Sequence, residues 1–289
     1  MHPRGARDFF DALVALGLLQ RRNGRYANTE QTDWFLDRGK PSYIGSLLEM
    51  ADRRLYPAWG ALTAALKTGE PQDAGMAENS SDEKFAALSA DPEKLRGFLR
   101  AMTGISLATT AGLVEKFPWR DYRNFCDVGS AEGALAVRLA RAYPHLSGGG
   151  FDLPAVRTHF ESYVRAQGLH SRLRFHAGDF FRDALPQADV LIMGHILHDW
   201  DLPEKKLLLR KAWQALPRGG ALVVYEALID DEREQNTFGL LMSLNMLLET
   251  RGGFDFSGAD CMAWMKAAGF TQSCVEPLTA THSMVIGIK

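Results

Sequence analysis

The chain has 289 residues, of which 46% are apolar and 24% are charged, and its formal net charge is −2. This length suffices for two domains that each bury a core, and the composition is that of an ordinary globular protein. The near-neutral charge argues against general binding to nucleic acid or to an anionic membrane.

The three cysteines, Cys126, Cys261 and Cys274, are widely spaced and form no C-x-x-C pair. Neither a disulfide framework nor a zinc site is therefore indicated. The N-terminus does not read as a signal peptide, and no uninterrupted apolar run approaches the roughly 18 to 20 residues of a membrane span. We expect a cytoplasmic protein without a bound metal.

The first 105 residues predict a mainly helical domain. Apolar residues recur at helical spacing over 4–19, and Asn23-Gly24 lies between two short strand-like arms, which is a strong hairpin signal. A helix followed by a hairpin is a winged-helix pattern. Residues 42–67 and 83–116 also read as mostly helical, and the stretch 68–81, rich in Gly, Pro, Asn and Ser, should be a loop between them.

The sequence pattern changes beyond Trp119, where short apolar strands are expected to alternate with amphipathic helices. This alternation predicts an α/β domain with a parallel sheet over residues 106–289. The last two of the predicted strands should form an antiparallel pair. The strands are expected at 124–128, 147–153, 173–177, 190–194, 221–227, 273–277 and 283–288.

A glycine turn follows the first strand of this domain, where residues 127–133 read Asp-Val-Gly-Ser-Ala-Glu-Gly. Such a turn is where a doubly wound sheet binds a nucleotide-like ligand, although a lone glycine turn is a weak signal. A dinucleotide site uses a middle glycine beside the pyrophosphate, and that place is taken here by Ala131 and Glu132. An acidic turn is compatible with S-adenosylmethionine, which has no phosphate and carries a sulfonium cation. Glu132 is equally well explained as an acid in the first turn of a helix.

Two further acids end neighbouring strands. Asp152 stands where it could accept hydrogen bonds from both ribose hydroxyls of such a cofactor. Asp179 could accept from the adenine amino group while Phe180 packs on the ring, although Gly178-Asp179-Phe180 alone is more typical of a turn. The two strand ends together favour adenosine recognition.

His198 follows the fourth strand, whose carboxyl end faces the ligand crevice of an α/β sheet. An imidazole there can take a proton from a phenol or a hydroxyl, although a packing role is an open alternative and His195 is a competing candidate. Glu226 ends the fifth strand, where it could orient the imidazole or be an ordinary strand-end acid. Asp255 precedes a predicted helix, where the simple interpretation is a helix-start acid.

These residues together resemble the small-molecule O-methyltransferases, a family that includes plant caffeate and flavonoid O-methyltransferases, acetylserotonin O-methyltransferase and bacterial enzymes that tailor polyketides and phenazines. The resemblance covers nearly the whole chain. Six motifs carry it in the family's order and spacing, namely Asp127-Val128-Gly129, Phe151-Asp152-Leu153-Pro154, Gly178-Asp179-Phe180, Leu197-His198-Asp199-Trp200, Ala215-Leu216-Pro217-Arg218-Gly219-Gly220 and Gly252-Gly253.

The resemblance implies a Rossmann-like class I methyltransferase fold with a seven-stranded sheet, S-adenosylmethionine as cofactor, a small-molecule hydroxyl acceptor and a homodimer. It implies that His198 is the general base, flanked by Glu226 and Asp255, and that no metal is required. The cofactor contacts it implies are Ser106, Asp127, Gly129, Gly133, Asp152, Leu153, Gly178, Asp179, Phe180, Met193 and Gly194. The acceptor contacts it implies are Met102, His195, Asn245 and Met246.

The chain also departs from the family pattern. Its turn has fewer glycines, Gly194 stands where plant members often carry a lysine, and Asp255 stands where they often carry a glutamate. The chain begins inside the winged-helix region, so we expect either a fragment or a trimmed dimer interface.

Two other functions are compatible with parts of the sequence. A family member can bind the cofactor yet perform other chemistry, or serve only as a partner subunit, because fold and cofactor site do not fix the reaction. A winged-helix DNA-binding regulator is suggested by Arg21, Arg22 and Arg25 on the predicted wing, although a duplex reader normally needs a broader basic face.

Overall fold

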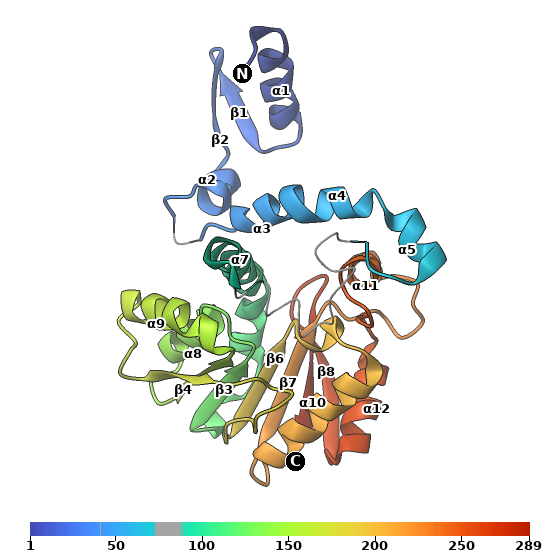
Figure 1. The fold of residues 1–289 in the computed structure, drawn as a ribbon. Coiled ribbons are helices and arrows are strands. Elements are labelled where there is room, and N and C mark those ends of the chain that lie inside the picture. The colour runs from blue at the N-terminus through green and yellow to red at the C-terminus, as the bar shows by residue number, and fades with distance from the viewer. Residues whose placement is uncertain (41, 73–87, 89) are drawn as a thin grey trace.

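The larger part of the molecule is a seven-stranded sheet whose strand order is β5-β4-β3-β6-β7-β9-β8 (Figure 1). The computed structural model describes residues 1–40, 42–72, 88 and 90–289. The strands are β3 (Asn124–Val128), β4 (Ser147–Asp152), β5 (Leu173–Ala177), β6 (Val190–Gly194), β7 (Ala221–Glu226), β8 (Gln272–Pro277) and β9 (Ser283–Ile288). β9 runs antiparallel to both of its neighbours, and the other pairings are parallel. The predicted strands, the antiparallel pair and the α/β fold class are confirmed, with strand ends that differ by one residue at most.

Helices cover both faces of this sheet, as the continuous apolar runs of its central strands require. All six residues of β7 are buried. One face packs against α8 (Ala134–Ala142), α9 (Arg157–Ala166) and part of α7 (Pro92–Lys116), and its core includes Phe125 and Phe160. The opposite face packs against α10 (Leu202–Ala215) and α12 (Gly258–Ala268), and its core includes Leu191 and Met265.

The N-terminal end forms the predicted helix and hairpin, which lie away from the sheet at the top of Figure 1. They are α1 (Pro3–Ala15), β1 (Leu19–Arg22) and β2 (Arg25–Asn28), followed by α2 (Glu30–Leu36). Asn23 and Gly24 have φ angles of 50° and 73°, the left-handed conformation that a two-residue hairpin turn of this kind needs.

The helix predicted over 42–67 is broken into four pieces. These are α3 (Gly45–Met50), the single π-helical turn η1 (Ala51–Leu55), α4 (Tyr56–Trp59) and α5 (Leu62–Thr68). Figure 1 shows that α3, α4 and α5 form one layer above the carboxyl edge of the sheet. The predicted loop over 68–81 lies outside the described residues from residue 73 onward.

The helix predicted over 83–116 is α7, and it begins only at Pro92. The Asp91 side chain accepts hydrogen bonds from the backbone N–H groups of Glu93 and Lys94, so the helix is capped at this point. Residues 83–87 and 89 lie outside the described part of the chain. The helix contacts both α3 and α8, so it joins the elements that precede it in the chain, α1 to α5 with the hairpin, to the sheet domain. These preceding elements are called the N-terminal layer below. The predicted domain boundary at 105/106 falls in the middle of α7 and stays a prediction.

By length and composition alone, α7 is apolar enough to cross a membrane. Its buried residues include Leu95, Leu99 and Leu113, which pack in the protein core.

Candidate active site

The carboxyl ends of four neighbouring parallel strands bring the predicted site residues to one edge of the sheet. Gly129 follows β3, Asp152 ends β4, Gly194 ends β6 and Glu226 ends β7. His198 lies just beyond β6 in the short 3₁₀ helix η4 (Leu197–Asp199). This edge is where an open α/β sheet binds its ligands.

The structure brings His198, Glu226 and Asp255 together, although they are far apart in sequence. His198 Nδ1 lies 3.3 Å from Asp255 Oδ1 and 3.8 Å from Glu226 Oε2. All three side chains are buried, and both Asp255 oxygens and Glu226 Oε2 are enclosed without another hydrogen-bond partner. Because Nδ1 faces the two carboxylates, Nε2 lies on the opposite side of the ring from them.

The electrostatics of this cluster favour a protonated imidazole. Burial by itself would lower the pKa of His198, but the charges of Glu226 and Asp255 outweigh it and raise the pKa to about 10. Burial raises the pKa of Glu226 to about 7, and His198 acts in the opposite direction. The two carboxylates therefore stabilise the cation that forms when the ring accepts a proton.

Glu226 also fixes the backbone that carries His198. Its Oε1 atom accepts hydrogen bonds from the N–H groups of Ile196, Leu197 and His198 at 3.0 to 3.4 Å. The turn begins at His195, whose φ of 54° is uncommon for a non-glycine residue and is held by the hydrogen bond from its N–H to the Tyr225 carbonyl. Glu226 therefore does more than end a strand, because it holds the backbone of the loop that carries His198.

A third histidine, which the sequence reading missed, completes the cluster. His282 lies between β8 and β9 and is only 7% exposed. Its ring centroid is 5.2 Å from that of His195, and Thr281 Oγ1 is 2.8 Å from its Nδ1. Burial lowers the pKa of both His195 and His282, so these two rings are neutral near pH 7. No local sequence signal marks His282, since only the closing of the sheet brings it here.

The same cluster has the donor atoms of a metal site. His195, His198 and Glu226 each offer one ligand atom, and these atoms lie within 4.8 Å of one another. The prediction of a metal-free site therefore stays a prediction.

The glycine turn is hydrogen-bonded both to the end of β4 and to α7. Asp152 Oδ2 accepts a hydrogen bond from the Ala131 N–H at 2.9 Å, and Asp152 Oδ1 accepts one from the Leu153 N–H at 2.7 Å. The Thr103 hydroxyl of α7 donates to Glu132 Oε2 at 2.7 Å. Glu132 is therefore a link between the turn and α7, an alternative that the sequence did not suggest.

Asp179 and Phe180 adopt the turn that their motif suggested. Asp179 Oδ1 accepts from the Phe181 N–H at 2.8 Å, and Asp183 Oδ2 accepts from the Asp179 N–H at 2.8 Å. The Phe180 ring packs edge-on against Trp200, with ring centroids 5.6 Å apart. Both side chains are only partly buried, so the adenine role assigned to them remains a prediction.

For two other residues assigned to the cofactor, packing inside the protein explains why that residue type stands at its position. The Met193 side chain is completely buried in the core between the sheet, α10 and α12, so only its backbone reaches the edge of the sheet. A Cβ atom at Gly194 would lie 1.9 Å from Tyr225 Cζ, which explains the absence of a side chain there. Ser106 of α7 lies close enough to the Tyr225 hydroxyl to act on its pKa.

The acceptor residues lie between the sheet domain and the N-terminal layer. The Trp59 indole N–H of α4 donates to Asn245 Oδ1 at 3.0 Å, and Asn245 belongs to α11 (Thr237–Glu249). Met246 is buried beside it, and Met102 of α7 is partly buried. Arg54 Nε in η1 lies 3.2 Å from Glu249 Oε1 at the end of α11, which makes a second contact between the two layers.

Comparison with known proteins assigns the family. Residues 59–271 match the O-methyltransferase domain family. The chain is 43% identical over 290 residues to the tetracenomycin polyketide synthesis 8-O-methyl transferase TcmO of Streptomyces glaucescens, covering all of this chain and 84% of that protein. This chain belongs to the O-methyltransferase family.

Other relatives include one that is named for a different acceptor atom. The N,N-dimethyltransferase OxyT of Streptomyces rimosus is 38% identical over 270 residues, which cover 93% of this chain and 77% of that protein. The structure of human N-acetylserotonin methyltransferase in complex with S-adenosylmethionine has a TM-score of 0.90 and 28% identity, and the match covers 99% of this chain and 83% of that one. The class I methyltransferase fold is thereby confirmed, and the cofactor of this O-methyltransferase is S-adenosylmethionine.

The residues at the edge fit this cofactor. Asp127 and Asp152 are carboxyls at the glycine turn, and burial raises the pKa of Asp127 to about 8 and that of Asp152 to about 6. No arginine or lysine among the described residues contributes to either shift. At pH 7 Asp152 is mainly ionised and Asp127 mainly protonated, so the charge of Asp152 favours a cationic cofactor at this edge and disfavours a phosphate.

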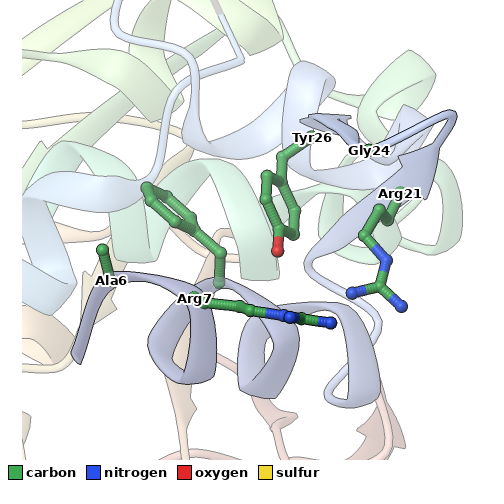
Figure 2. A pocket seen from close by; sticks show the side chains of 6 residues that line it. Ala6, Arg7, Arg21, Gly24 and Tyr26 are labelled. Atoms are coloured by element: carbon green, nitrogen blue, oxygen red, sulfur yellow. The ribbon is translucent and has the colours of Figure 1, made fainter. Parts of the chain in front are cut away.

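One hollow in the described part of this O-methyltransferase lies away from this edge. It measures about 600 Å³, lies between α1 and the hairpin, and is lined by Ala6, Arg7, Phe10, Arg21, Gly24 and Tyr26 (Figure 2). None of the predicted site residues lines it. Arg21 Nη1 lies 2.6 Å from Asp11 Oδ1, so this wing arginine is paired within the chain, which weakens the DNA-binding alternative.

Proposed function

We propose that this O-methyltransferase methylates a hydroxyl of a small aromatic or polyketide-like acceptor, with His198 as general base. The observation that carries the proposal is the buried contact of His198 Nδ1 with Asp255 Oδ1 at 3.3 Å, beside Glu226. An imidazole oriented by a carboxylate through one nitrogen presents the other nitrogen to a substrate proton. The comparisons support the acceptor class, because TcmO is named for a polyketide O-methylation.

The three residues have different tasks in this mechanism. His198 Nε2 takes the proton from the acceptor hydroxyl, and the growing charge on the ring is balanced by Asp255 and Glu226. Glu226 also holds the loop in place through three backbone N–H groups. Asp255 is the closer carboxylate and orients the ring.

The cofactor, when bound, supplies a methyl group on a cationic sulfur. We assign its ribose to Asp152 and Leu153, its adenine to Gly178, Asp179 and Phe180, and the rest to the turn and strand residues Ser106, Asp127, Gly129, Gly133, Met193 and Gly194. Asp152 supports this assignment because it ends β4 beside the turn and remains partly accessible.

We assign the acceptor pocket to Met102, His195, Asn245 and Met246. The contact of Trp59 with Asn245 supports this, because it places the α3–α5 layer over the same residues and so helps to exclude water. A methionine is a flexible, polarisable neighbour for a flat acceptor. We further propose that the reaction needs no metal.

A homodimer and a cytoplasmic location are part of this proposal. Large apolar side chains are exposed in the N-terminal layer, among them Phe9, Leu16, Trp34, Phe35 and Tyr56. Such exposure suits an interface with a second copy. The three free cysteines suit a reducing compartment.

An amine acceptor is the second candidate, since OxyT is named an N,N-dimethyltransferase. A member that binds the cofactor without transferring its methyl group is the third. A panel of phenolic and amine acceptors, assayed with labelled cofactor, separates the three.

The decisive variant is His198→Gln, which retains hydrogen-bonding capacity but has no ring to accept a proton. Calorimetry should show unchanged binding of S-adenosylhomocysteine, and the transfer rate should fall about a hundredfold or more. A folded His198→Gln enzyme that transfers at the wild-type rate would sink the base assignment. Wild-type enzyme that binds the cofactor but methylates none of the panel would favour the third candidate.

A further inference from the structure

Lys205 is a fully buried lysine behind the catalytic cluster, with 0% of its surface exposed. It is the fourth residue of α10, whose N-cap is Asp201. A buried ammonium group loses its hydration, and the N-terminal turn of a helix is the end that disfavours a cation. Two unfavourable effects thus act on this charge, and specific partners must offset them.

The partners of the ammonium group belong to the two segments that carry the catalytic residues. Lys205 Nζ donates to the Trp200 carbonyl, where η4 with His198 ends. The same Nζ lies 3.6 Å from the centre of the Phe254 ring and 5.7 Å from that of Phe256. Phe254 and Phe256 flank Asp255 in sequence. One side chain therefore connects the loop of the base to the segment of its closest carboxylate.

The charges around Lys205 lead to the same cluster. Glu226, Asp255, Asp199 and Asp201 all raise its pKa, whereas burial acts more strongly and lowers it to about 8. The side chain is thus mainly cationic at pH 7. Its charge opposes that of the two carboxylates that hold the proton on His198.

We propose that Lys205 is a positioning residue for the reaction, which joins the His198 loop to the Asp255 segment and offsets the charge of Glu226 and Asp255. It does not touch the reacting atoms. Without its charge, the carboxylates hold the imidazole proton more tightly, and less of the ring is in the neutral form that acts as a base. The charges that act on His198 come from Glu226, Asp255 and Asp199, and the same three acids also act on Lys205. The neutral rings of His195 and His282 lie beside this cluster.

Two neutral variants separate the contact from the charge. Lys205→Gln loses the charge but keeps an N–H donor for the Trp200 carbonyl, and Lys205→Met loses both. Lys206→Met, one residue further along α10 and only partly buried, is the matched control. Circular dichroism and thermal unfolding establish that each variant is folded.

The measurement is the pH dependence of kcat/KM together with the dissociation constant of S-adenosylhomocysteine. In both neutral variants kcat/KM at pH 7, where Lys205 carries its charge, should fall about tenfold, which corresponds to a rise of about one unit in the pKa of His198. The difference between Lys205→Gln and the wild type should shrink above pH 8, where Lys205 itself loses its proton. Only Lys205→Met should also lower the high-pH plateau, and cofactor binding should stay within twofold of wild type. Lys206→Met should match the wild type throughout.

A folded Lys205→Gln variant whose kcat/KM is unchanged at pH 7, or is lowered equally at pH 7 and pH 9, overturns the inference even if thermal stability falls, because a purely structural lysine would give no loss that fades as Lys205 is deprotonated. The inference rests on the proposed function, and His198→Gln tells the two failures apart. A wild-type rate in His198→Gln would contradict the assignment of His198 as general base. An inactive His198→Gln together with a wild-type pH profile in Lys205→Gln would contradict only the role of Lys205.

Discussion

The ring of Tyr225 occupies the space that a side chain at Gly194 would need, since a Cβ atom there would lie 1.9 Å from Tyr225 Cζ and 2.3 Å from its hydroxyl oxygen. Tyr225 is only 3% exposed and its ring packs edge-on against that of His195, so the ring has little freedom to move. The lysine that plant members often carry at this position is therefore incompatible with Tyr225 as it stands.

Gly194→Ala should accordingly lower the free energy of unfolding by about 1–3 kcal/mol, the usual effect of overpacking a core. The matched control is Gly97→Ala, at an exposed position of α7 where nothing lies within 4 Å of the new Cβ atom. This control should gain about 0.5–1 kcal/mol, because alanine is the better helix former. Urea unfolding measures both, and an unaltered Gly194→Ala would mean that the Tyr225 ring moves aside freely.

The pH dependence of transfer should be governed by His198. Its pKa is raised to about 10, so the ring is protonated at neutral pH, and the reactive neutral form increases as the pH rises. Transfer should therefore rise with pH from 7 toward 10. Asp255→Asn removes one of the two charges that raise this pKa and should move the limb to lower pH, so transfer at pH 7 gains from the pKa change in this variant, whereas it falls in the neutral Lys205 variants.

The high-pH plateau of Asp255→Asn should still fall, since the ring loses the carboxylate that orients it. Initial rates at saturating cofactor, measured at half-unit steps of pH, give both quantities. A limb that moves upward in Asp255→Asn would contradict the electrostatic assignment.

Ala131 adopts a left-handed conformation, with φ of 47°, within the cofactor turn. A glycine relieves the steric cost of this conformation but adds flexibility to the unfolded chain, so Ala131→Gly should stabilise the protein by up to about 1 kcal/mol. Ala263→Gly, at an exposed position within α12, should instead destabilise it by about 0.5–1 kcal/mol. Equal losses in both variants would show that the turn carries no strain at this residue.

The strands of the sheet could be predicted from the sequence because each one is marked by a pattern in its own residues. The apolar run of β6 and the glycine turn after β3 are local patterns, and the parallel order gathers their carboxyl ends at one edge. His198 and Glu226 could be placed at that edge for the same reason. Asp255 was placed beside His198 only through resemblance to the family.

The contacts that the sequence did not reveal all depend on tertiary packing. Trp59 and Asn245 are 186 residues apart, and Thr103 of α7 reaches Glu132 in the glycine turn. His282 has no motif of its own. The buried Lys205 read as one of several charges on an amphipathic helix, because burial of a lysine is visible only when its partners are in place.

The proposed metal-free reaction has a direct test, since His195, His198 and Glu226 have the spacing of possible ligands. Overnight dialysis against EDTA, followed by elemental analysis, should leave the transfer rate unchanged, because the base acts on the acceptor proton without a Lewis acid. Recovery of activity on adding back one divalent metal to an inactive dialysed enzyme would overturn this expectation.

Cofactor affinity should depend on the charge of Asp152. Burial raises its pKa to about 6, so the carboxylate is ionised above this pH and becomes protonated below it. A protonated Asp152 keeps fewer lone pairs for ribose hydroxyls, so binding of S-adenosylhomocysteine should weaken as the pH falls through 6. Asp152→Asn should lose about ten- to hundredfold in affinity at pH 8, the usual range for hydrogen bonds to a charged group.

Asp152→Asn should also flatten the pH dependence of binding, whereas Glu161→Gln, an exposed acid on α9, should change neither quantity. Calorimetry from pH 5 to 8 measures both. Because Asp152 also accepts the Ala131 N–H at 2.9 Å, a loss of affinity could arise from a disordered turn, and unfolding of the variant with and without ligand separates the two causes. A variant as stable as wild type that binds with wild-type affinity would remove Asp152 from the cofactor site.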